Sequence, residues 1–454
     1  MKYRNLGNRG LRVSAIGLGC MGMSHAYGAP ADHREMTELL AKAVDMGYDF
    51  FDTAEIYGTP DNTHDNEELL GNALKAYRNK IIIATKFGLR FDMESGHVPY
   101  PLISDSRPTT IRKAVEGSLR RLQTDYIDLY YQHRPDPQIP IEEVAGTMQD
   151  LIKEGKVLYW GLSEAPEADI RRANAVCPLT AVQNRYSMMA RWQETMFPIL
   201  EELGIGLVAF SPLANGLLSD RYDAASHFDE RTDYRAGMPQ FQPESYKKNY
   251  ELLQFIRRIA SERHVTPAQI SLAWVLCKKP WIVPIPGTRK SDRLKENAGA
   301  VDVLLSEEEV KQIDHALDTM SMSDVYGGTK LTVCNVGNDV VMNVKFFGYG
   351  LFPYINGNGI ASLFSRTRNQ CVLHIGKTNH YILSPFDAFI LFGASHSVIL
   401  LHFIVAKQFP ISRRRSVANT FMWSQIAKIQ DFVRTVGMGN GIPIKIAGNE
   451  KSRK

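Results

Sequence analysis

The chain has 454 residues, of which 44% are hydrophobic and 22% are charged, and its formal net charge at pH 7 is +4. These values are typical of globular proteins and exclude a disordered chain, a collagen-like repeat and a small disulfide-stapled fold. The five cysteines are widely spaced with no CxxC pair, which argues against a disulfide framework or a zinc site and favours a reducing compartment. The N-terminus lacks the apolar core of a secretory signal, so we expect a cytoplasmic protein.

The charge is unevenly distributed along the chain. Residues 333–454 contain 14 Lys and Arg but 4 Asp and Glu, whereas residues 1–332 contain 39 basic and 45 acidic residues. The near-neutral total therefore combines an acidic part with a basic part. We expect two regions: a domain at residues 1–331, and a basic C-terminal extension of unassigned fold, unselected or disordered, at residues 332–454.

The first region alternates between short apolar runs and amphipathic stretches. A hairpin is predicted at its start, from Tyr3–Leu6 and Leu11–Val13. Eight strands follow, at Ala15–Gly19, Tyr48–Asp52, Ile81–Lys86, Ile127–Gln132, Leu158–Ser163, Ala181–Asn184, Gly206–Phe210 and Ile282–Ile285. Helical patterns between them include Glu35–Met46, Asp65–Ala76, Thr109–Leu122, Ile141–Glu154, Glu167–Ala175 and Glu194–Leu203. This alternation favours an α/β fold, a closed (β/α)8 TIM barrel, with an open doubly wound sheet as the alternative.

One glycine motif bears on that alternative. Residues Gly17 to Gly22 read GxGxxG after the first strand, the pattern of a dinucleotide-binding turn. That fingerprint requires a helix to begin at once, but the chain continues through an aperiodic stretch that contains Pro30. We interpret the glycines as shaping the first strand-to-loop turn of a barrel.

Four ionisable residues stand at the C-terminal ends of three consecutive predicted strands, where barrel enzymes place their active sites. Asp52 ends the second strand, Tyr57 lies in the loop after it, Lys86 ends the third strand and His133 ends the fourth. Each of them alone is more often structural than catalytic. Their combination on adjacent strands is what indicates chemistry.

These four residue types suit proton donation to a carbonyl oxygen. A nearby ammonium such as that of Lys86 stabilises a phenolate and lowers the pKa of a tyrosine, which is ordinarily about 10. Asp52 would compensate the buried charge, and a neutral His133 would hydrogen-bond the substrate oxygen while Tyr57 protonates it. Because no side chain supplies hydride, this chemistry requires a nicotinamide cofactor.

The motifs GLGCMGM, FDTAEIYG, IIIATKFG, DLYYQHRPD, GLSEA, AFSPLANGLL and PIPGTRKSDRLKEN occur in this order along the chain. From about Tyr3 to about Leu317 the chain closely resembles the aldo-keto reductase superfamily, in the branch of pyridoxal reductase-like and other microbial and plant enzymes. The resemblance implies that Asp52, Tyr57, Lys86 and His133 form the catalytic tetrad, with Tyr57 as the general acid. It also implies NADPH-dependent reduction of the carbonyl of an aldehyde or ketone to an alcohol.

The resemblance further implies a set of cofactor contacts. Ser163 and Gln183 are expected to bind the nicotinamide carboxamide and Phe210 to stack on the ring, whereas Glu164 stands where many relatives have Asn. Other expected contacts are Met21 in the first loop; Ser211, Leu213 and Asn215 over the pyrophosphate; Gly287, Thr288, Arg289 and Arg293 around the adenosine 2′-phosphate; and Glu296 and Asn297 on the adenine. Basic side chains at a helix N-terminus favour NADPH over NADH.

The insert from Leu218 to Tyr246 is polar, aromatic-rich and aperiodic, as expected of a long loop over an active site. Met23, Tyr27, Arg134 and Trp192 are candidates for the substrate mouth, each with plain packing or a surface position as the alternative. Their identity does not point beyond a neutral, small-molecule aldehyde or ketone.

The extension has a different pattern. Residues 388–406 are a run of 19 residues without a formal charge, and Lys407 and Arg413–Arg415 follow it. This length and basic flank suit a segment that spans a bilayer. An accessory domain and an unselected extension are the alternatives. Its histidines are too irregularly spaced for a metal site, and its basic run lacks the aromatic interleaving of a nucleic-acid surface, so neither a metal nor a nucleic-acid partner is expected. The oligomeric state is left open, as are two other functions: an NADPH-binding redox-sensing subunit of a larger complex, and a membrane-tethered reductase.

Overall fold

The computed structural model describes residues 1–95 and 101–325, and beyond them the backbone of seven short strands. Contacts within the chain divide it into two compact units, Met1–Gly328 and Thr329–Lys454. Each unit is described by itself, because their relative placement is not determined.

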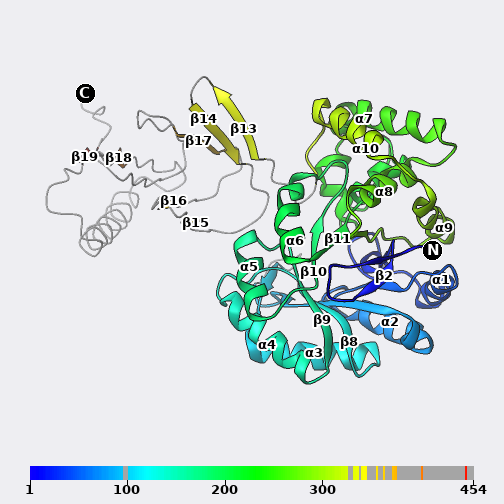
Figure 1. The fold of residues 1–454 in the computed structure, drawn as a ribbon, viewed down its shortest axis with the longest axis vertical. Helices are drawn as coiled ribbons and strands as arrows, with labels where there is room; N and C mark the ends of the chain where they lie inside the picture. Colours follow the sequence, from blue (N-terminus) through cyan, green and yellow to red (C-terminus); the bar gives the residue numbers. More distant parts are fainter. Residues whose placement is uncertain are drawn as a thin grey trace, which may run out of the picture. The chain divides into compact units, whose positions relative to one another are not determined.

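The first unit is built on a sheet of eight parallel strands. These are β3 (Leu18–Gly19), β4 (Phe50–Asp52), β5 (Ile82–Phe87), β8 (Ile127–Gln132), β9 (Val157–Ser163), β10 (Ala181–Arg185), β11 (Gly206–Phe210) and β12 (Ile282–Pro284). They follow one another across the sheet in chain order, and every pairing is parallel. Each strand overlaps one of the eight predicted from the apolar runs, and Figure 1 shows helices around the outside of the sheet.

The sheet closes on itself into a barrel. The Gly17 amide donates a hydrogen bond to the Pro284 carbonyl at 3.0 Å, and Gly19 pairs with Gly287 in a parallel bridge. This contact needs glycine, because a Cβ atom on Gly19 would lie 2.7 Å from the backbone oxygen of Ile285. The predicted (β/α)8 fold is confirmed.

The GxGxxG motif thus contributes to barrel closure. Its last two residues lie in a 3-10 turn, η1 (Met21–Met23), and the first α-helix, α1, begins only at His33. No helix starts directly after the glycines, as the dinucleotide-binding turn would require.

An N-terminal hairpin covers one end of the barrel. Strands β1 (Tyr3–Asn5) and β2 (Arg12–Ser14) pair antiparallel, as predicted. Leu6, Leu11 and Val13 pack with the barrel-lining residues of the central strands. A Cβ atom on Gly7 would clash with backbone atoms of Thr180, Gly204 and Gly206, which lie at the N-terminal ends of β10 and β11. The C-terminal ends of the strands are therefore the end left for a functional site.

The helices are α1 (His33–Asp45), α2 (Asp65–Leu74), α3 (Pro108–Leu122), α4 (Ile141–Lys153), α5 (Glu167–Val176), α6 (Phe197–Leu203), α7 (Pro243–Glu262), α8 (Pro267–Lys278), α9 (Ser291–Gly299) and α10 (Glu307–Thr319). Short 3-10 turns are η2 (Lys75–Lys80), η3 (Trp192–Met196), η4 (Ala214–Ser219), η5 (Tyr234–Gly237), η6 (Pro239–Phe241) and η7 (Ala300–Asp302). A small hairpin, β6 (Leu89–Phe91) with β7 (Leu102–Ser104), follows β5.

Three predicted helix starts differ from the structure: α1 begins at His33 rather than at Glu35, and proline explains the other two differences, in α3 and α6. Helix α3 begins at Pro108, one residue before the predicted start at Thr109, and Arg107 is its N-cap, because the fixed φ of proline suits the first helical position. Helix α6 begins at Phe197 after the 3-10 turn η3. Pro198 has no N–H to donate to the carbonyl of Glu194, so an α-helix cannot run through from Glu194 as predicted.

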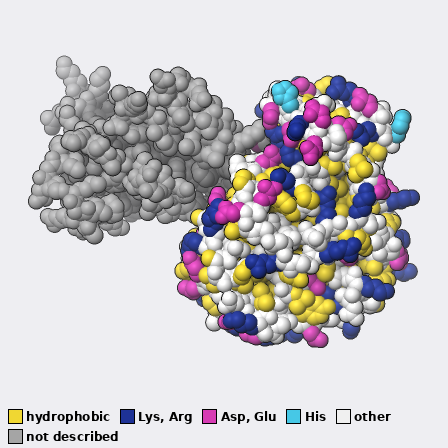
Figure 2. All heavy atoms as spheres, in the orientation of Figure 1, with side chains coloured by type: hydrophobic (Ala, Val, Ile, Leu, Met, Phe, Trp, Pro, Cys, Tyr) yellow, Lys and Arg dark blue, Asp and Glu magenta, His cyan; other side chains and the backbone are white. Residues whose placement is uncertain are grey.

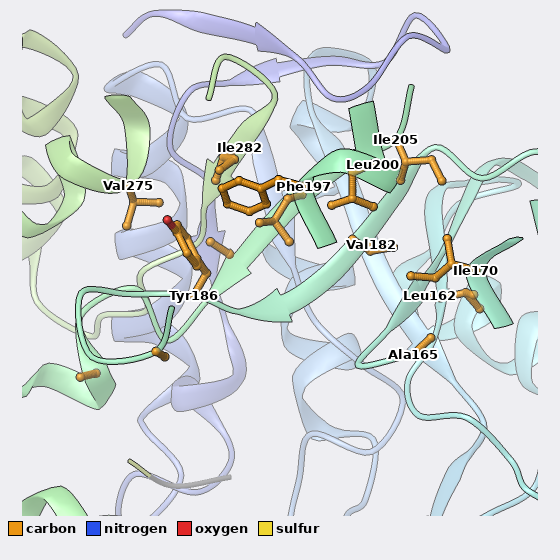
Figure 3. Packing of buried hydrophobic residues seen from close by; sticks show 14 of the residues in the cluster. Leu162, Ala165, Ile170, Val182, Tyr186, Phe197, Leu200, Ile205, Val275 and Ile282 are labelled. Atoms are coloured by element: carbon orange, nitrogen blue, oxygen red, sulfur yellow. The ribbon is translucent and has the colours of Figure 1, made fainter. Parts of the chain in front are cut away.

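The core lies between the outer face of the barrel and its helices. Figure 3 shows Leu162, Val182 and Ile282 of the strands meeting Ile170, Phe197, Leu200 and Val275 of α5, α6 and α8, with Tyr186 beside Val275 and Phe197. Tyr186 stacks on Trp274 with ring centroids 5.4 Å apart. This packing fixes the strands, and hence the side chains at their ends, as one rigid frame.

The visible face of the first unit carries basic and acidic side chains interspersed with apolar ones (Figure 2). In the second unit, β13 (Leu331–Val336), β14 (Asp339–Val344) and β17 (Cys371–Ile375) form an antiparallel sheet. The pairs β15 (Tyr354–Ile355) with β16 (Ala361–Ser362) and β18 (Leu400–Leu401) with β19 (Lys445–Ile446) complete the described strands. The predicted apolar segment 388–406 otherwise lies outside the described residues, and within the described part no helix is long and apolar enough to cross a bilayer.

Candidate active site

The four predicted tetrad residues lie together at the C-terminal ends of β4, β5 and β8. The Lys86 ammonium donates to Asp52 Oδ1 at 2.6 Å and to the Thr53 carbonyl at 2.7 Å. It also lies 4.9 Å from the centroid of the Tyr57 ring. The Tyr57 and His133 rings meet edge to face with centroids 5.6 Å apart. The barrel therefore joins residues that are up to 81 positions apart in the sequence.

Burial dominates the electrostatics of this cluster. Burial alone would lower the pKa of Lys86, but the charge of Asp52, together with interactions with Asp52 and Tyr57, outweighs it and holds that pKa above its usual value, so the ammonium stays charged. Burial raises the pKa of Tyr57, and the Lys86 charge opposes this rise. The lysine thus acts in the direction expected from the sequence, although burial outweighs it.

His133 is held neutral. Burial, followed by the nearby charges of Arg134 and Lys86, lowers its pKa well below the usual value. Its buried Nδ1 has no hydrogen-bond partner among the described residues. A neutral imidazole keeps one N–H donor, so His133 next to the Tyr57 ring can hydrogen-bond a carbonyl oxygen without a charge of its own.

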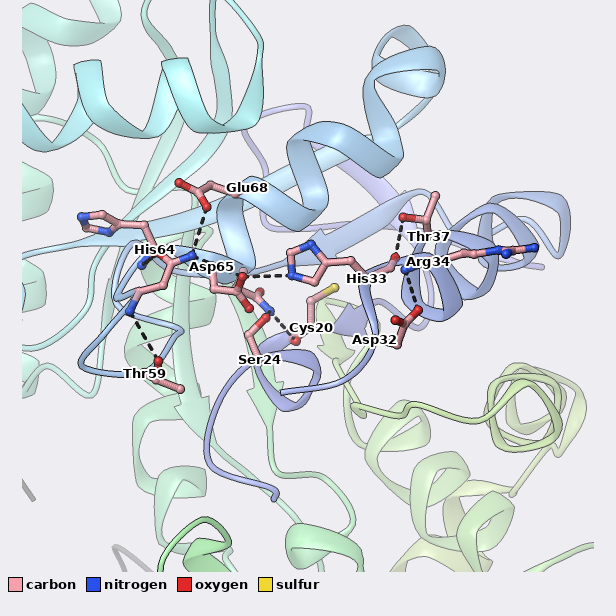
Figure 4. A network of polar contacts seen from close by, with 12 residues as sticks. Cys20, Ser24, Asp32, His33, Arg34, Thr37, Thr59, His64, Asp65 and Glu68 are labelled. Carbon is pink, nitrogen blue, oxygen red and sulfur yellow. Dashed lines mark hydrogen bonds and ion pairs between the residues drawn. The ribbon is translucent and has the colours of Figure 1, made fainter. Parts of the chain in front are cut away.

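A second layer of polar side chains fixes the loop that carries Tyr57. Asn66, at the start of α2, donates to the Cys20 carbonyl and to Ser24 Oγ, both at 3.0 Å, and its side-chain oxygen accepts from Thr53 Oγ1 at 2.6 Å. The backbone amide of Asn66 also donates to the Tyr57 carbonyl. Figure 4 shows Cys20 and Ser24 within this network and the His33–Asp65 pair beside it, which joins α1 to α2 at 2.9 Å. Thr53 and Asn66 were not among the predicted site residues; for Thr53, its place in the FDTAEIYG motif was the available signal.

The two residues expected at the nicotinamide carboxamide have other partners here. Gln183, on β10, donates to Asp52 Oδ2 at 2.7 Å. Ser163, at the end of β9, accepts from Arg134 Nη1 at 3.0 Å. Glu164 adopts a left-handed backbone with φ of 55°, and its carboxylate accepts from the Arg185 amide at 3.0 Å. Gln183 therefore supports the Asp52–Lys86 pair directly.

The segment after β11 is organised around Asn215. This residue donates to the Tyr27 hydroxyl at 2.6 Å and to Ser211 Oγ at 3.3 Å, and its oxygen accepts from Arg185 and Gln240. Ser211 and Asn215 both have left-handed backbones, with φ of 51° and 60°. The predicted residues Phe210, Ser211, Leu213 and Asn215 thus form one tight turn, in which the Arg185 guanidinium lies 4.9 Å from the Phe210 ring centroid.

Part of the predicted insert pairs with the first loop. Tyr27 forms an antiparallel bridge with Asp233, and the Tyr234 amide donates to the Ala26 carbonyl. Arg235 binds Asp233 and lies over the Phe228 ring at 4.4 Å. Of the four residues considered for the substrate mouth, Met23 is a core residue and Trp192 packs against the main core cluster.

The predicted 2′-phosphate segment leads into α9. Gly287 contacts Gly19, and Thr288 Oγ1 accepts from the Lys290 amide at 3.0 Å. Arg289 donates to the carbonyls of Gly22 and Ala29, so it joins this segment to the first loop, and its buried Nη2 has no partner within the described residues. Further along α9, Glu296 forms an ion pair with Arg221 at 3.0 Å, and Asn297 is buried. Arg293, in the same helix, makes no hydrogen bond or ion pair with any described residue.

Near the tetrad, Met21 packs against the small cluster of Ala54, Ile56 and Tyr57. Across residues 1–95 and 101–325, no group of three or more His, Cys, Asp or Glu residues is placed to hold a metal ion.

A (β/α)8 barrel with this polar cluster at the C-terminal ends of its strands has the architecture of an enzyme. Its class follows from comparison with known proteins: the chain belongs to the aldo/keto reductase family, whose model matches residues 15–318, and it is an oxidoreductase. Among curated proteins it is similar to the probable aldo-keto reductase 1 of Glycine max, with 42% identity over 325 residues that cover 71% of this chain and 90% of the relative.

Solved structures show the same relationship. The glycerol dehydrogenase of Gluconobacter oxydans matches with a TM-score of 0.64 and 28% identity, over 70% of this chain and 95% of that one. An aldo-keto reductase of Bacillus halodurans in its holo form matches with a TM-score of 0.57 and 29% identity, over 72% and 98%. The family uses nicotinamide cofactors to reduce carbonyl groups of small molecules, and this much is established for the chain.

Proposed function

We propose that the chain reduces the carbonyl of an aldehyde or ketone to an alcohol with NADPH, and that Tyr57 is the general acid. The observation that carries this proposal is the buried cluster of Asp52, Tyr57, Lys86 and His133 at the open end of the barrel. Family membership supplies the reaction class, and the cluster supplies the groups that would move the proton.

The described residues fit a nicotinamide dinucleotide with a phosphate on its adenosine. Helix α9 begins without a side-chain cap, so its first amides are available to an anion. The unpartnered buried Nη2 of Arg289 is a second donor beside this helix. Because Arg289 already binds two carbonyls, we assign the main charge contact with the 2′-phosphate to Arg293 and the helix N-terminus. When bound, NADPH supplies the hydride that the carbonyl carbon receives.

The side chains have separate tasks in this proposal. The Tyr57 hydroxyl donates its proton to the carbonyl oxygen, and the phenolate that remains is stabilised by the Lys86 ammonium. Asp52, held by Gln183 and Lys86, keeps that ammonium charged in a buried place. Neutral His133 donates a hydrogen bond to the carbonyl oxygen and aligns it with Tyr57. Solvent then returns a proton to Tyr57 after the alcohol leaves.

The proposal is tested by following NADPH absorbance with the full chain and a panel of aldehydes. We expect saturable, aldehyde-dependent oxidation. We also expect a kcat/KM for NADH at least about tenfold lower, since one charge-assisted contact is worth roughly 1.5–3 kcal/mol. Tight NADPH binding without oxidation by any aldehyde would contradict the proposed reductase activity and favour a redox-sensing subunit of a larger complex.

A further inference from the structure

Arg134 places a positive charge at the open end of the barrel that no described carboxylate pairs with. Asp52 and Lys86 neutralise each other. Arg134, which follows His133 directly, adds a second positive charge, and no ion pair joins it to a carboxylate within the described residues. By contrast, Arg121 binds Glu67 and Arg172 binds Glu142. A half-buried guanidinium without an acidic partner is free to bind an anionic ligand.

The geometry of Arg134 leaves one edge of its guanidinium available. Its Nη1 donates both to the His133 carbonyl at 2.7 Å and to Ser163 Oγ at 3.0 Å. These two bonds fix the plane of the group, whereas Nε and Nη2 make no hydrogen bond with any described residue. The Nε–Nη2 edge is the one that binds a planar carboxylate through two parallel hydrogen bonds.

The cofactor phosphates are not expected to supply this anion. In the proposed binding mode they lie at the turn of Ser211 to Asn215 and at the start of α9. Arg134 instead contacts Ser163, on the strand end assigned to the nicotinamide. Its charge acts on the reacting groups themselves, because after burial it is the next largest cause that lowers the pKa of His133.

The surroundings of Tyr57 are apolar and aromatic. His25 stacks on the Tyr57 ring with centroids 6.1 Å apart and planes 12° from parallel, and Phe91 lies 6.4 Å from His25. Met21, Leu89 and Phe91 pack against the cluster that contains Tyr57. A ligand that enters here meets an apolar wall and the Arg134 guanidinium, which lies 6.0 Å from the centroid of the Phe210 ring.

We propose that the substrate is a carbonyl compound with an apolar, aromatic-sized body that carries a carboxylate, and that Arg134 binds this carboxylate. Arg134 is then a specificity-determining residue, and the substrate differs from the neutral aldehyde or ketone expected from the sequence. This inference rests on the proposed function, since it names the substrate class of the same site.

The test compares matched substrate pairs: 2-, 3- and 4-carboxybenzaldehyde, each beside its methyl ester. For at least one pair we expect the acid to exceed the ester in kcat/KM by about 10- to 100-fold, the value of a charge-assisted bidentate contact. In Arg134→Met this ratio falls to about one, and in Arg134→Lys it is intermediate because the planar fork is lost. Arg172→Met, an exposed paired arginine, keeps the wild-type ratio.

The assignment of Arg134 would be overturned if kcat/KM for the acid did not exceed that for the ester in any wild-type pair, or if the acid-to-ester ratio were unchanged in Arg134→Met. Neither result would contradict the reductase function. If no aldehyde is reduced, the proposed function fails, and the inference is judged by binding. Calorimetric titration with benzoate and with methyl benzoate should then show at least about tenfold tighter binding of the acid in wild type and no such difference in Arg134→Met. Equal binding of both compounds by wild type would contradict the carboxylate site.

Discussion

Glu55 lies two residues before Tyr57 and ties its loop to the strand that carries Lys86. Its amide donates to the Lys86 carbonyl at 3.2 Å, and its carboxyl oxygen accepts from the Gly88 amide at 3.0 Å. Burial raises the pKa of Glu55 to about 8, and the charge of fully buried Glu67 adds to the rise. The charge of Arg121 lowers this pKa and that of Asp105 raises it, each to a smaller extent. Glu55 is therefore protonated in the folded chain at neutral pH.

This raised pKa makes stability depend on pH. The ordinary pKa of glutamate is about 4.3, so between about pH 4.3 and 8 the folded chain holds a proton that the unfolded chain has lost, and the free energy of unfolding falls as pH rises through this window. Glu55→Gln keeps an oxygen for Gly88 and removes the ionisation. We expect its Tm to exceed that of wild type by a few degrees at pH 8 and by much less at pH 5. Thermal melts of both proteins at pH 5 and pH 8 measure this difference in Tm, and Glu308→Gln, at an exposed position, is the control. A Tm difference between Glu55→Gln and wild type that does not change with pH would contradict the prediction.

At the residue scale, the sequence predicted the four tetrad residues at strand ends but not all of their hydrogen-bond partners. The positions of Asp52, Lys86 and His133 at strand ends follow from apolar runs, which can be counted along the chain. Other contacts depend on distances across the barrel and between loops. Examples are the hydrogen bond from Gln183 to Asp52 and those from Arg289 to the carbonyls of Gly22 and Ala29. Partner choice of this kind is decided by tertiary packing, which a single sequence does not display.

At the scale of elements, all eight barrel strands were predicted because strands buried on both faces are continuous apolar runs. Helix α8 was not assigned, and the reason is physical: residues on all sides of it are buried, including Ala268, Leu272 and Trp274, so it lacks the polar face that creates a helical period. The hairpin β6–β7 was missed because its strands are three residues long and largely solvent-accessible.

Barrel closure gives a prediction at this scale. A Cβ atom on Gly19 would lie 2.7 Å from a backbone oxygen, so Gly19→Ala should force β3 from β12 and lower the free energy of unfolding by about 1–3 kcal/mol. Gly146, inside α4, has open space around it, and Gly146→Ala should raise that free energy by about 0.5–1 kcal/mol. Urea denaturation of both variants measures the difference. Equal midpoints would show that the contact between the first and last strands carries no strain.

At the scale of the whole molecule, the N-terminal hairpin covers the N-terminal ends of the strands and so leaves the chemistry at the opposite end. Contacts within the chain divide it into two compact units, Met1–Gly328 and Thr329–Lys454. The boundary at residue 331 and the role of residues 332–454 stay predictions.

The central claim is that Tyr57 protonates the carbonyl oxygen, and Tyr57→Phe in the full chain tests it most directly. The variant removes one oxygen and keeps the ring that packs against His133 and His25. We expect aldehyde-dependent NADPH oxidation to fall by about 100- to 10,000-fold, the usual contribution of a general acid, while NADPH binding measured by fluorescence changes little. Turnover near the wild-type rate would contradict the account.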